Sequence, residues 1–302
     1  MKLKYWFFLS RVPFLSVMIA PYTLGAVLAG RFLGIFNWPV FLTGLLGAVL
    51  VQLIAHYSGE VYDLAEDRLS VSLEKNFFTG GSQVLVENHI APQKVKNLIR
   101  LIFLLAVITG LILQFHFKTG KWTLWLGISG IACAYFYSRP PLRLAGRGIG
   151  ELLIAYAFGW LSVNAGFYLQ ASLFNNLAAW VSLPIACTVA NIILINEYPD
   201  YPADKQHAKR NILVRIGKAR GAVLYVWLAV CGPATFFLAL AKGLPAPAAV
   251  FYLPVLILSV SLAYQMFKGG YNHHKKLEKM CALTILVNLG TVLSCILGLL
   301  FS

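Results

Sequence analysis

Residues 38–68 read WPVFLTGLLGAVLVQLIAHYSGEVYDLAEDR. Residues 38–59 carry no Asp, Glu, Lys or Arg, and they match the ~20 apolar residues that an α-helix needs to cross a bilayer. The remaining residues, 60–68, hold a series of carboxylates that ends at Arg68. The stretch therefore predicts a membrane-spanning helix that ends in a dense acidic cluster.

The composition extends this pattern to the whole chain. Its 302 residues are 59% hydrophobic and 12% charged, with a mean hydropathy of +0.73, whereas a soluble domain carries roughly 25% charged residues. We therefore expect one all-α polytopic membrane domain over residues 1–302, and its apolar spans exclude a soluble protein that binds nucleic acid. Nine spans are predicted, at residues 11–31, 38–59, 97–116, 122–138, 151–170, 175–196, 220–241, 247–267 and 281–300.

Charge is divided unevenly between the two sides of this predicted bundle. Of the 25 Lys and Arg residues, all fall on the side of the N-terminus except Arg31, Lys118, Lys121 and Lys242. Because basic residues accumulate in cytoplasmic loops, this side should face the cytoplasm from the inner (cytoplasmic) membrane of the cell. The acidic residues all fall on the same side: Glu60, Asp63, Glu66, Asp67, Glu74, Glu87, Glu151, Glu197, Asp200, Asp204 and Glu278. We therefore expect a site that uses carboxylates at the cytoplasmic face.

Two acidic clusters share one spacing, in which a Glu is followed by an Asp three residues later and by another Asp four residues after that. The clusters are Glu60, Asp63 and Asp67, and Glu197, Asp200 and Asp204. On a helix each set points its carboxylates at one spot, where their mutual repulsion requires a cation. Hard oxygen ligands favour Mg²⁺, which also bridges to phosphate oxygens. Pro199 and Pro202 should make the second segment irregular, as a helix that unwinds at its end.

Basic residues lie close to both clusters: Arg68, Arg139, Arg143, Lys205, Lys209 and Arg210. A metal site surrounded by Arg and Lys suits a diphosphate, because the metal bridges its oxygens and the cations neutralise the remaining charge. A solvated loop held by salt bridges would explain a single cluster equally well. It does not explain two clusters of matched spacing at the ends of even-numbered spans.

At these residues the sequence resembles the UbiA superfamily of intramembrane prenyltransferases, whose first motif reads Asn-Asp-x-x-Asp-x-x-x-Asp. Here Gly59 and Glu60 replace the Asn and the first Asp, whereas Asp63 and Asp67 match. The second motif is NEYPDYPADK at residues 196–205, followed by KRN at 209–211. Further similarity lies in YSRPPLRLAGRGIGE at 137–151 and in GGSQVLVE at 80–87, which is similar to members near the dihydroxynaphthoate branch.

The resemblance implies nine transmembrane helices around a central cavity, and Mg²⁺-dependent transfer of a polyprenyl group from polyprenyl diphosphate to an aromatic or lipid acceptor. It implies metal ligands at Glu60, Asp63, Asp67, Glu197, Asp200 and Asp204. It implies catalytic roles for Asp63, Asp67, Asp200, Asp204 and Tyr137. It implies diphosphate contacts from Arg68, Arg139, Arg143, Asn196, Lys205, Lys209 and Arg210. The prenyl tail should lie in a groove between helices that is open to membrane lipid.

Several acceptors fit this resemblance. Residues 80–87 favour 1,4-dihydroxy-2-naphthoate, in menaquinone biosynthesis, and the alternatives are 4-hydroxybenzoate, a tetrapyrrole or a glycerol-phosphate lipid. An ion-coupled transporter is the alternative from another class, but its charges should lie near the middle of the spans. His56 lies one helical turn before Glu60, where it could deprotonate an acceptor or serve only the structure.

Overall fold

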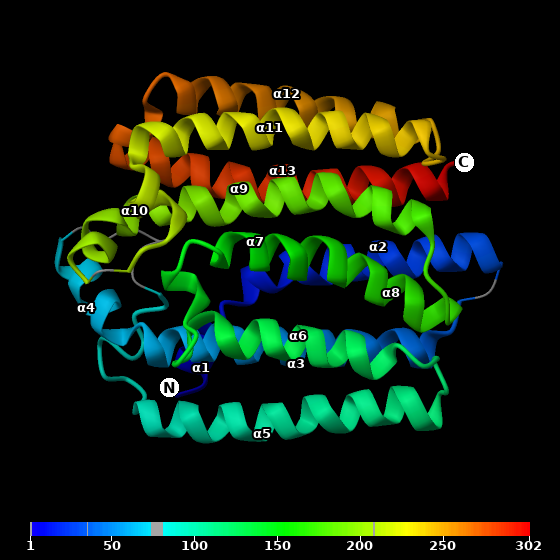
Figure 1. Ribbon diagram of the computed structural model, residues 1–302, viewed down its shortest axis with the longest axis horizontal. Coiled ribbons are helices and arrows are strands. Elements are labelled where there is room, and N and C mark those ends of the chain that lie inside the picture. The colour runs from blue at the N-terminus through cyan, green and yellow to red at the C-terminus, as the bar shows by residue number, and fades with distance from the viewer. Residues whose placement is uncertain (1, 35, 74–80, 208) are drawn as a thin grey trace.

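The structure is a computed structural model that describes residues 2–34, 36–73, 81–207 and 209–302 (Figure 1). Glu74 and Gly80, which belong to the sequence patterns above, lie outside these ranges. Every regular element within the ranges is a helix, so the predicted all-α class is confirmed.

Within the described ranges, eight helices are long and apolar enough to cross a membrane, one fewer than predicted. They are α2 (Val12–Leu33), α3 (Trp38–Tyr62), α5 with η1 (Pro92–His116), α7 with η3 and α8 (Gly150–Ala171), α9 (Asn176–Gln206), α11 (Lys218–Ala241), α12 (Pro247–Phe267) and α13 (His274–Leu300). Two spans contain π-helical turns, η1 (Ile112–His116) after α5 (Pro92–Leu111) and η3 (Tyr156–Leu161) between α7 (Gly150–Ala155) and α8 (Ser162–Ala171). The chain is an integral membrane protein.

The prediction of a full span at residues 122–138 is wrong. The helix there, α6 (Thr123–Ser138), has 16 residues, so at ~1.5 Å per residue it is about 24 Å long, shorter than the ~30 Å hydrocarbon core. It ends at Ser138 because Arg139 precedes a proline, which favours extended backbone, and Arg139 has φ −86° and ψ 135°. Although short, α6 packs along α3 (Figure 1).

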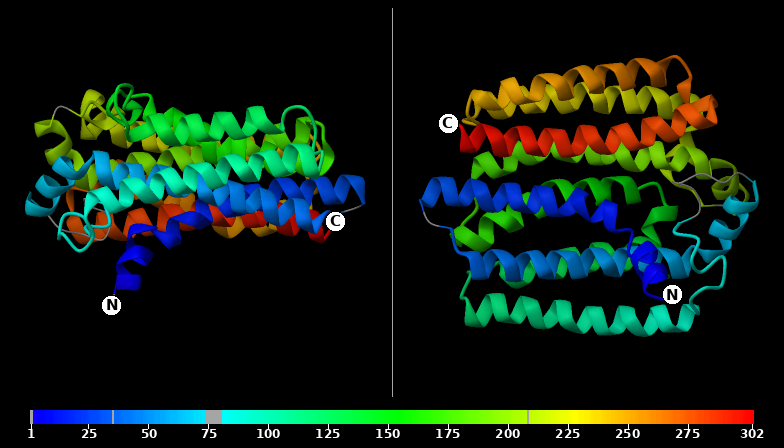
Figure 2. Two further views of the ribbon diagram at one scale, coloured as in Figure 1. Left: turned by 90° about the horizontal axis from the view of Figure 1, so that it is seen from below. Right: turned by 180° about the vertical axis from the view of Figure 1, so that it is seen from behind.

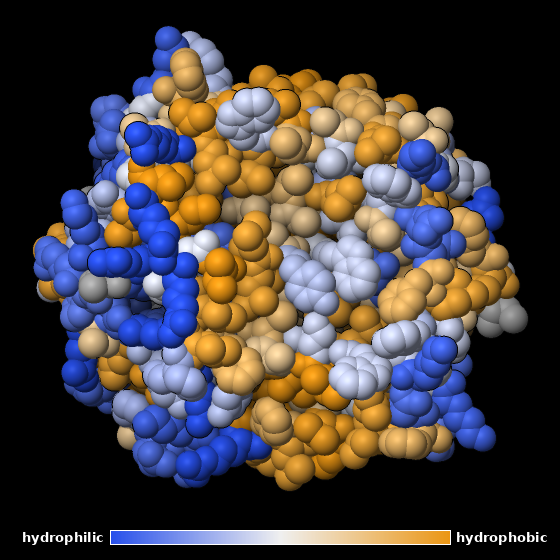
Figure 3. Space-filling view, viewed as in Figure 1, coloured by the Kyte–Doolittle hydropathy of each residue, from blue (hydrophilic) through white to orange (hydrophobic). Residues whose placement is uncertain are grey.

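The long helices run side by side, and the longer connections gather at one end of the bundle (Figure 1). The short helices near this end are α4 (Leu64–Leu73), η2 (Leu144–Gly146), α10 (Ile212–Ile216) and η4 (Gly270–Asn272). Figure 3 shows the larger share of hydrophilic residues at this end and smaller hydrophilic groups at the opposite end, whereas the middle of the bundle presents mainly hydrophobic residues. Helix α1 (Lys2–Leu9) projects from the bundle (Figure 2). The predicted separation of charged loops from apolar spans is therefore seen in the fold.

Glycines allow α2 and α8 to pack with their backbones in contact. A Cβ atom on Gly25 would lie 1.9 Å from the carbonyl oxygen of Val163, and one on Gly166 would lie 2.1 Å from that of Tyr22. Small residues permit such close crossings between membrane helices. This crossing fixes α2 in the bundle, and with it the residues at the N-terminal end of α2.

Candidate active site

Members of both acidic clusters line one polar cavity of about 240 Å³. Asp63 and Asp67 come from the junction of α3 and α4, and Glu197, Asp200 and Asp204 come from the end of α9. The fold thus brings together side chains that lie at least 130 positions apart in the chain.

The first cluster lies at a break between two helices. Helix α3 ends at Tyr62, and Asp63 departs from helical geometry, with φ −101° and ψ 10°, before α4 begins at Leu64. Backbone hydrogen bonds still cross the break, because Asp63 N–H donates to Gly59 O and Asp67 N–H donates to Asp63 O, each at 2.9 Å. The break therefore keeps Asp63 and Asp67 directed at the same cavity.

The second cluster lies on a continuous helix, so the prediction of an irregular end is wrong. Helix α9 runs through Pro199 and Pro202 to Gln206. A proline inside a helix frees the carbonyl four residues earlier, and for Pro199 this carbonyl belongs to Ile195. Cys281 of α13 donates its Sγ–H to that carbonyl oxygen at 3.8 Å. The neighbouring helix thus replaces the lost hydrogen bond, and the three carboxylates stay on one helical face.

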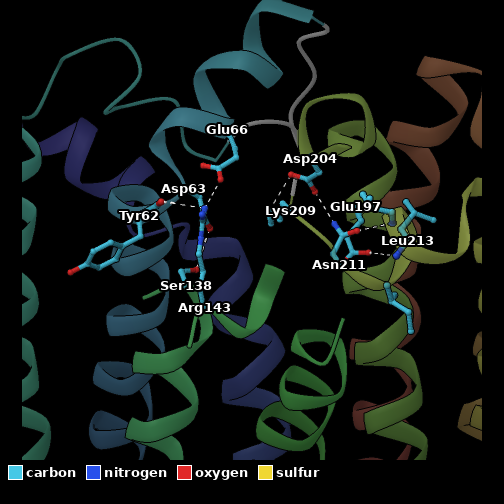
Figure 4. A network of polar contacts seen from close by, with 12 residues as sticks. Tyr62, Asp63, Glu66, Ser138, Arg143, Glu197, Asp204, Lys209, Asn211 and Leu213 are labelled. Carbon is cyan, nitrogen blue, oxygen red and sulfur yellow. Dashed lines mark hydrogen bonds and ion pairs between the residues drawn. The ribbon is translucent and has the colours of Figure 1, made fainter. Parts of the chain in front are cut away.

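Arg143 joins the first cluster to the loop that follows α6. Its Nη2 donates to Asp63 Oδ1 at 2.9 Å and to a carboxylate oxygen of Glu66 (Figure 4). Ser138 donates its Oγ–H to Asp63 Oδ2 at 3.2 Å. Burial would lower the pKa of Arg143, but its hydrogen bonds to the two carboxylates and their charges outweigh burial and raise it. Arg143 is therefore a fixed positive charge beside the cavity.

Lys209 and Asn211 contact the second cluster from the turn after α9. Asn211 Nδ2 donates to Asp204 Oδ2 at 2.7 Å, and Lys209 Nζ lies 3.4 Å from Asp204 Oδ1 (Figure 4). Burial would lower the pKa of Lys209, but the charges of Asp204 and Asp63 outweigh it and raise this pKa well above its ordinary value. Lys209, which also lines the cavity, thus places a permanent positive charge among the aspartates.

Glu197 has a second role at the start of α10. The backbone N–H of Leu213 donates to Glu197 Oε2 at 3.4 Å, and that of Ile212 donates to Glu151 Oε1 at 2.6 Å. The first N–H groups of a helix lack partners within the helix, so these two glutamates cap α10 while Glu197 also lines the cavity.

The other predicted site residues divide between the cavity and the surface. Asn196 and Tyr137 line the cavity. The side chains of Arg68, Lys205 and Arg210 are exposed. The structure therefore brings only part of the predicted set to one place.

Arg139 and Glu60 make contacts that the sequence does not predict. The Arg139 guanidinium lies over the ring of Tyr135, 4.3 Å from its centroid, and 5.7 Å from that of Tyr62. Glu60 is buried, with 2% of its surface exposed, and forms an ion pair with Arg11 in which the closest atoms are 2.7 Å apart. Its oxygens thus interact with protein donors in this structure.

A second cavity, of about 150 Å³, adjoins the polar one within the bundle. The residues that line both are Gln52, Ala55, Tyr137, Ile154 and Phe158. The second cavity is lined mainly by apolar and small side chains, and the absence of side chains at Gly47 and Gly130 helps to leave it open. A long apolar ligand with a charged head can therefore extend through both cavities.

Several residues beside the polar cavity were not predicted as site residues, among them Arg11, Glu66, Ser138 and Glu151. Ser138 and Glu151 lie inside the stretch 137–151 that resembles the family, and Glu66 lies between two predicted aspartates. At those three positions the sequence therefore already indicated a site residue. Arg11 reaches the cavity only because the chain turns between α1 and α2, which no local pattern indicates.

The cavity offers the oxygen ligands that Mg²⁺ prefers. Besides the carboxylates it contains Asn196, and no described residue donates a hydrogen bond to the buried Oδ1 of that side chain. Throughout the described ranges, no three His, Cys, Asp or Glu side chains lie close enough to hold an ion by themselves. Mg²⁺ is commonly bound by one or two carboxylates together with substrate phosphates, and the residues present fit that mode.

Comparison with known proteins agrees with this arrangement. The sequence matches the UbiA prenyltransferase family over residues 18–298. It is 25% identical over 279 residues to the 2-carboxy-1,4-naphthoquinone phytyltransferase of Synechocystis sp., covering 92% of this chain and 86% of that one. It is 25% identical over 283 residues to the 1,4-dihydroxy-2-naphthoate octaprenyltransferase of Bacillus subtilis, covering 91% and 85%.

A solved structure shows the same fold. A UbiA homologue from Archaeoglobus fulgidus bound to GPP and Mg²⁺ aligns with a TM-score of 0.67 at 14% sequence identity, covering 96% of this chain and 99% of that one. Because the family match extends over nearly the whole chain, this protein belongs to the UbiA prenyltransferase family.

Proposed function

We propose that this enzyme transfers a prenyl group from a polyprenyl diphosphate to 1,4-dihydroxy-2-naphthoate, with Mg²⁺ as cofactor, in menaquinone biosynthesis. One observation carries the proposal: a polar cavity lined by aspartates, Lys209 and Arg11 adjoins an apolar cavity inside the bundle. A polyprenyl diphosphate combines a charged head and an apolar tail in the same way. The naphthoquinone and naphthoate substrates in the names of the two relatives support the choice of acceptor.

The polar cavity is suited to the diphosphate. In this proposal Asp63 and Asp67 of the first cluster and Asp200 and Asp204 of the second would hold Mg²⁺ together with the diphosphate, and the metal would supply Lewis acidity to the diphosphate oxygens when bound. As the allylic C–O bond breaks, the diphosphate leaves with the electron pair and negative charge grows on its oxygens. Lys209 is partly buried beside the aspartates before the substrate arrives, so its charge stabilises the growing negative charge without reorganisation.

The acceptor completes the reaction. It supplies the electron pair of the new bond to the prenyl carbon and loses a proton or carbon dioxide from the same atom. Tyr137 lines both cavities, so its ring lies where the head and tail of the donor meet. An aromatic ring stabilises a nearby cation through its π electrons, and Tyr137 is placed to do so for the allylic cation.

The orientation in the membrane follows from charge. The acidic clusters and most basic loops belong to the end of the bundle at which Figure 3 shows the larger share of hydrophilic residues, and basic loops face the cytoplasm. We infer that the polar cavity opens toward the cytoplasm from the inner membrane.

Mg²⁺ binding should strengthen as the pH rises. Burial and the charge of Glu60 raise the pKa of Asp67 well above its ordinary value. A carboxyl with a raised pKa in the folded protein favours the protonated form at low pH, and it loses that proton as the pH passes upward through the folded pKa. Since Mg²⁺ competes with this proton, we expect the Mg²⁺-induced rise in melting temperature to be larger at pH 8 than at pH 6. Asp67→Asn should reduce the difference, and an equal shift at both pH values in the wild type would contradict the assignment.

A larger side chain in the apolar cavity should reduce activity most with prenyl diphosphates that have long tails. Gly130 lines this cavity, and a Cβ atom there would make ordinary contacts at 3.5 Å with Val51 and 3.7 Å with Leu161. Gly130→Leu should therefore fold but occupy space that a long prenyl tail needs. We expect kcat/KM to fall at least ~10-fold more for a C20 donor than for a C10 donor, because each unburied CH₂ group costs about 0.8 kcal/mol. Gly130→Ala is the control, and an equal loss for both donors would show that the tail lies elsewhere.

The function is tested by incubating the purified protein in lipid nanodiscs with Mg²⁺, labelled polyprenyl diphosphates and a panel of acceptors. The panel contains 1,4-dihydroxy-2-naphthoate, 4-hydroxybenzoate, a tetrapyrrole and a glycerol-phosphate lipid, and products are identified by mass spectrometry. We expect a prenylated naphthoquinol that requires Mg²⁺. Product from another acceptor alone would overturn the choice of acceptor, and no product from any acceptor would overturn the proposed activity.

A further inference from the structure

Glu60 differs from the other carboxylates of the two clusters in what it contacts. Its Oε1 accepts hydrogen bonds from Arg11 Nε at 3.0 Å, from Arg11 Nη2 at 2.7 Å and from the backbone N–H of Ser82 at 2.7 Å. Its Oε2 accepts from Ser82 Oγ at 2.7 Å. The donors come from the junction of α1 and α2 and from the segment 81–90, so three separate parts of the chain meet at this carboxylate.

The hydrogen bonds use most of the accepting capacity of Glu60. An ionised carboxylate offers about four lone-pair sites, and the described residues supply four donors, three to Oε1 and one to Oε2. Asp63, which lines the polar cavity, receives hydrogen bonds from Arg143 and Ser138 only, among the described residues. Glu60 is absent from the described residues that line the cavity, although its neighbour Gly59 is among them. Arg11 also neutralises the charge of Glu60, so a metal ion is not needed there.

We propose that Glu60 is a positioning residue that anchors Arg11 and the segment 81–90 against the cavity, and that it does not bind the metal. The sequence expectation treats Glu60 as the equivalent of the first aspartate in the family motif. The contacts instead give it a mechanical role, in which it fixes one wall of the cavity while Asp63 and Asp67 face the interior.

The packing around Gly81 supports this role. Gly81 has φ +67°, a conformation that favours glycine. A Cβ atom there would lie 2.8 Å from Asp67 Oδ2, 2.9 Å from Arg11 Nη2 and 2.9 Å from Glu60 Oε1. The backbone of the segment 81–90 is therefore pressed directly against the ion pair, and Gly81 and Arg11 both line the cavity.

The same segment is tied to α1 at its other end. The ring of His89 stacks on that of Tyr5, with centroids 4.0 Å apart and planes at 20°. Ser10, beside Arg11, forms a hydrogen bond between its Oγ and the Tyr57 hydroxyl oxygen at 2.7 Å. Loss of the Glu60 anchor should therefore loosen both the segment and the orientation of the Arg11 guanidinium at the cavity. Only the effect on donor binding rests on the proposed function.

The test compares Glu60→Gln with Asp67→Asn in the full-length protein. The first readout is cleavage after the exposed Glu87 by a glutamate-specific protease, and the second is the Mg²⁺ concentration that gives half of the thermal shift. For Glu60→Gln we expect cleavage at least ~5-fold faster and a half-saturating Mg²⁺ concentration within ~2-fold of wild type. For Asp67→Asn we expect wild-type cleavage and at least ~10-fold more Mg²⁺. The proposal is overturned if Glu60→Gln leaves cleavage unchanged or raises the Mg²⁺ requirement ~10-fold.

Three further measurements keep the test decisive. Ser82→Ala removes one hydrogen-bond donor to Glu60 with little risk to folding and should accelerate cleavage less than Glu60→Gln.

In a double-mutant cycle, Arg11→Gln combined with Glu60→Gln should lower the melting temperature less than the sum of the single effects, because the pair acts as a unit. In the active enzyme, Glu60→Gln should raise the KM for the prenyl donor ~10-fold and change kcat less than ~3-fold. If the wild-type protein shows neither turnover nor a Mg²⁺-induced thermal shift, the proposed function fails. The protease cleavage rates and the double-mutant cycle would still show whether Glu60 anchors the segment 81–90.

Discussion

Asp63→Ala and Asp200→Ala are each expected to abolish Mg²⁺-dependent prenyl transfer while leaving the protein folded. Both residues line the polar cavity, but they come from different clusters, so each variant removes one side of the proposed metal site. Arg143 loses Asp63 as a partner but keeps Glu66, and this limits the structural cost. Since the leaving diphosphate gains charge in the transition state, loss of metal contacts should lower kcat/KM by roughly 10³-fold or more.

This prediction needs a control that removes a carboxylate elsewhere at the same end. Glu87→Gln serves, because Glu87 is exposed and pairs with His89 at 3.0 Å outside the cavity. Turnover of labelled donor, gel-filtration profile and melting temperature should be measured for all three variants. Full activity in both aspartate variants would refute the assignment of the site.

The predictions that succeed depend on local sequence. A run of apolar residues predicts a span because the bilayer requires every backbone group to be bonded within the segment, whatever the neighbours are. The repeated spacing of the acidic clusters likewise predicts which carboxylates share a helix face. The bounds predicted for α6, residues 122–138, were nearly right, but they already fell short of the ~20 residues that a full span needs, so the sequence itself indicated a short helix.

Arg68 and Lys205 show how adjacency in sequence misleads. Each directly follows an aspartate that lines the cavity, and each has an exposed side chain. Successive residues on a helix are rotated by about 100°, so a residue next to a cavity-facing aspartate need not face the cavity, and these two do not line it. Helical geometry therefore argues against both as diphosphate ligands in this structure.

The pairing of Arg11 with Glu60 lies beyond local reasoning. The two residues are 49 positions apart, and their meeting depends on how α2 is fixed in the bundle and on the left-handed conformation of Arg11, with φ 48°. Tertiary packing alone decides such contacts. The identity of Glu60 as a departure from the family motif was visible in the sequence, but its partner was not.

Lys209→Met is expected to weaken catalysis and strengthen Mg²⁺ binding at the same time. Lys209 lies in the cavity, 3.4 Å from Asp204, where its charge offsets the repulsion among the aspartates. Without it, the carboxylates should attract a divalent cation more strongly, so the half-saturating Mg²⁺ concentration should fall several-fold. The leaving diphosphate, however, loses a charge-assisted donor, and kcat/KM should fall about 100-fold.

Because Lys209→Met should strengthen Mg²⁺ binding but weaken catalysis, the two measurements together distinguish a charge effect from a loss of structure. In the absence of Mg²⁺ the melting temperature of Lys209→Met should fall, because Asp204 keeps Asn211 as a hydrogen-bond partner but loses its nearby cation. Added Mg²⁺ should restore much of that loss, since one cation can replace another beside buried carboxylates. Lys205→Met, which removes an exposed lysine next to Asp204, is the matched control. It should change neither the half-saturating Mg²⁺ concentration nor kcat/KM by more than ~2-fold. If Lys209→Met weakened Mg²⁺ binding together with turnover, Lys209 would be supporting the geometry of the carboxylates rather than balancing their charge.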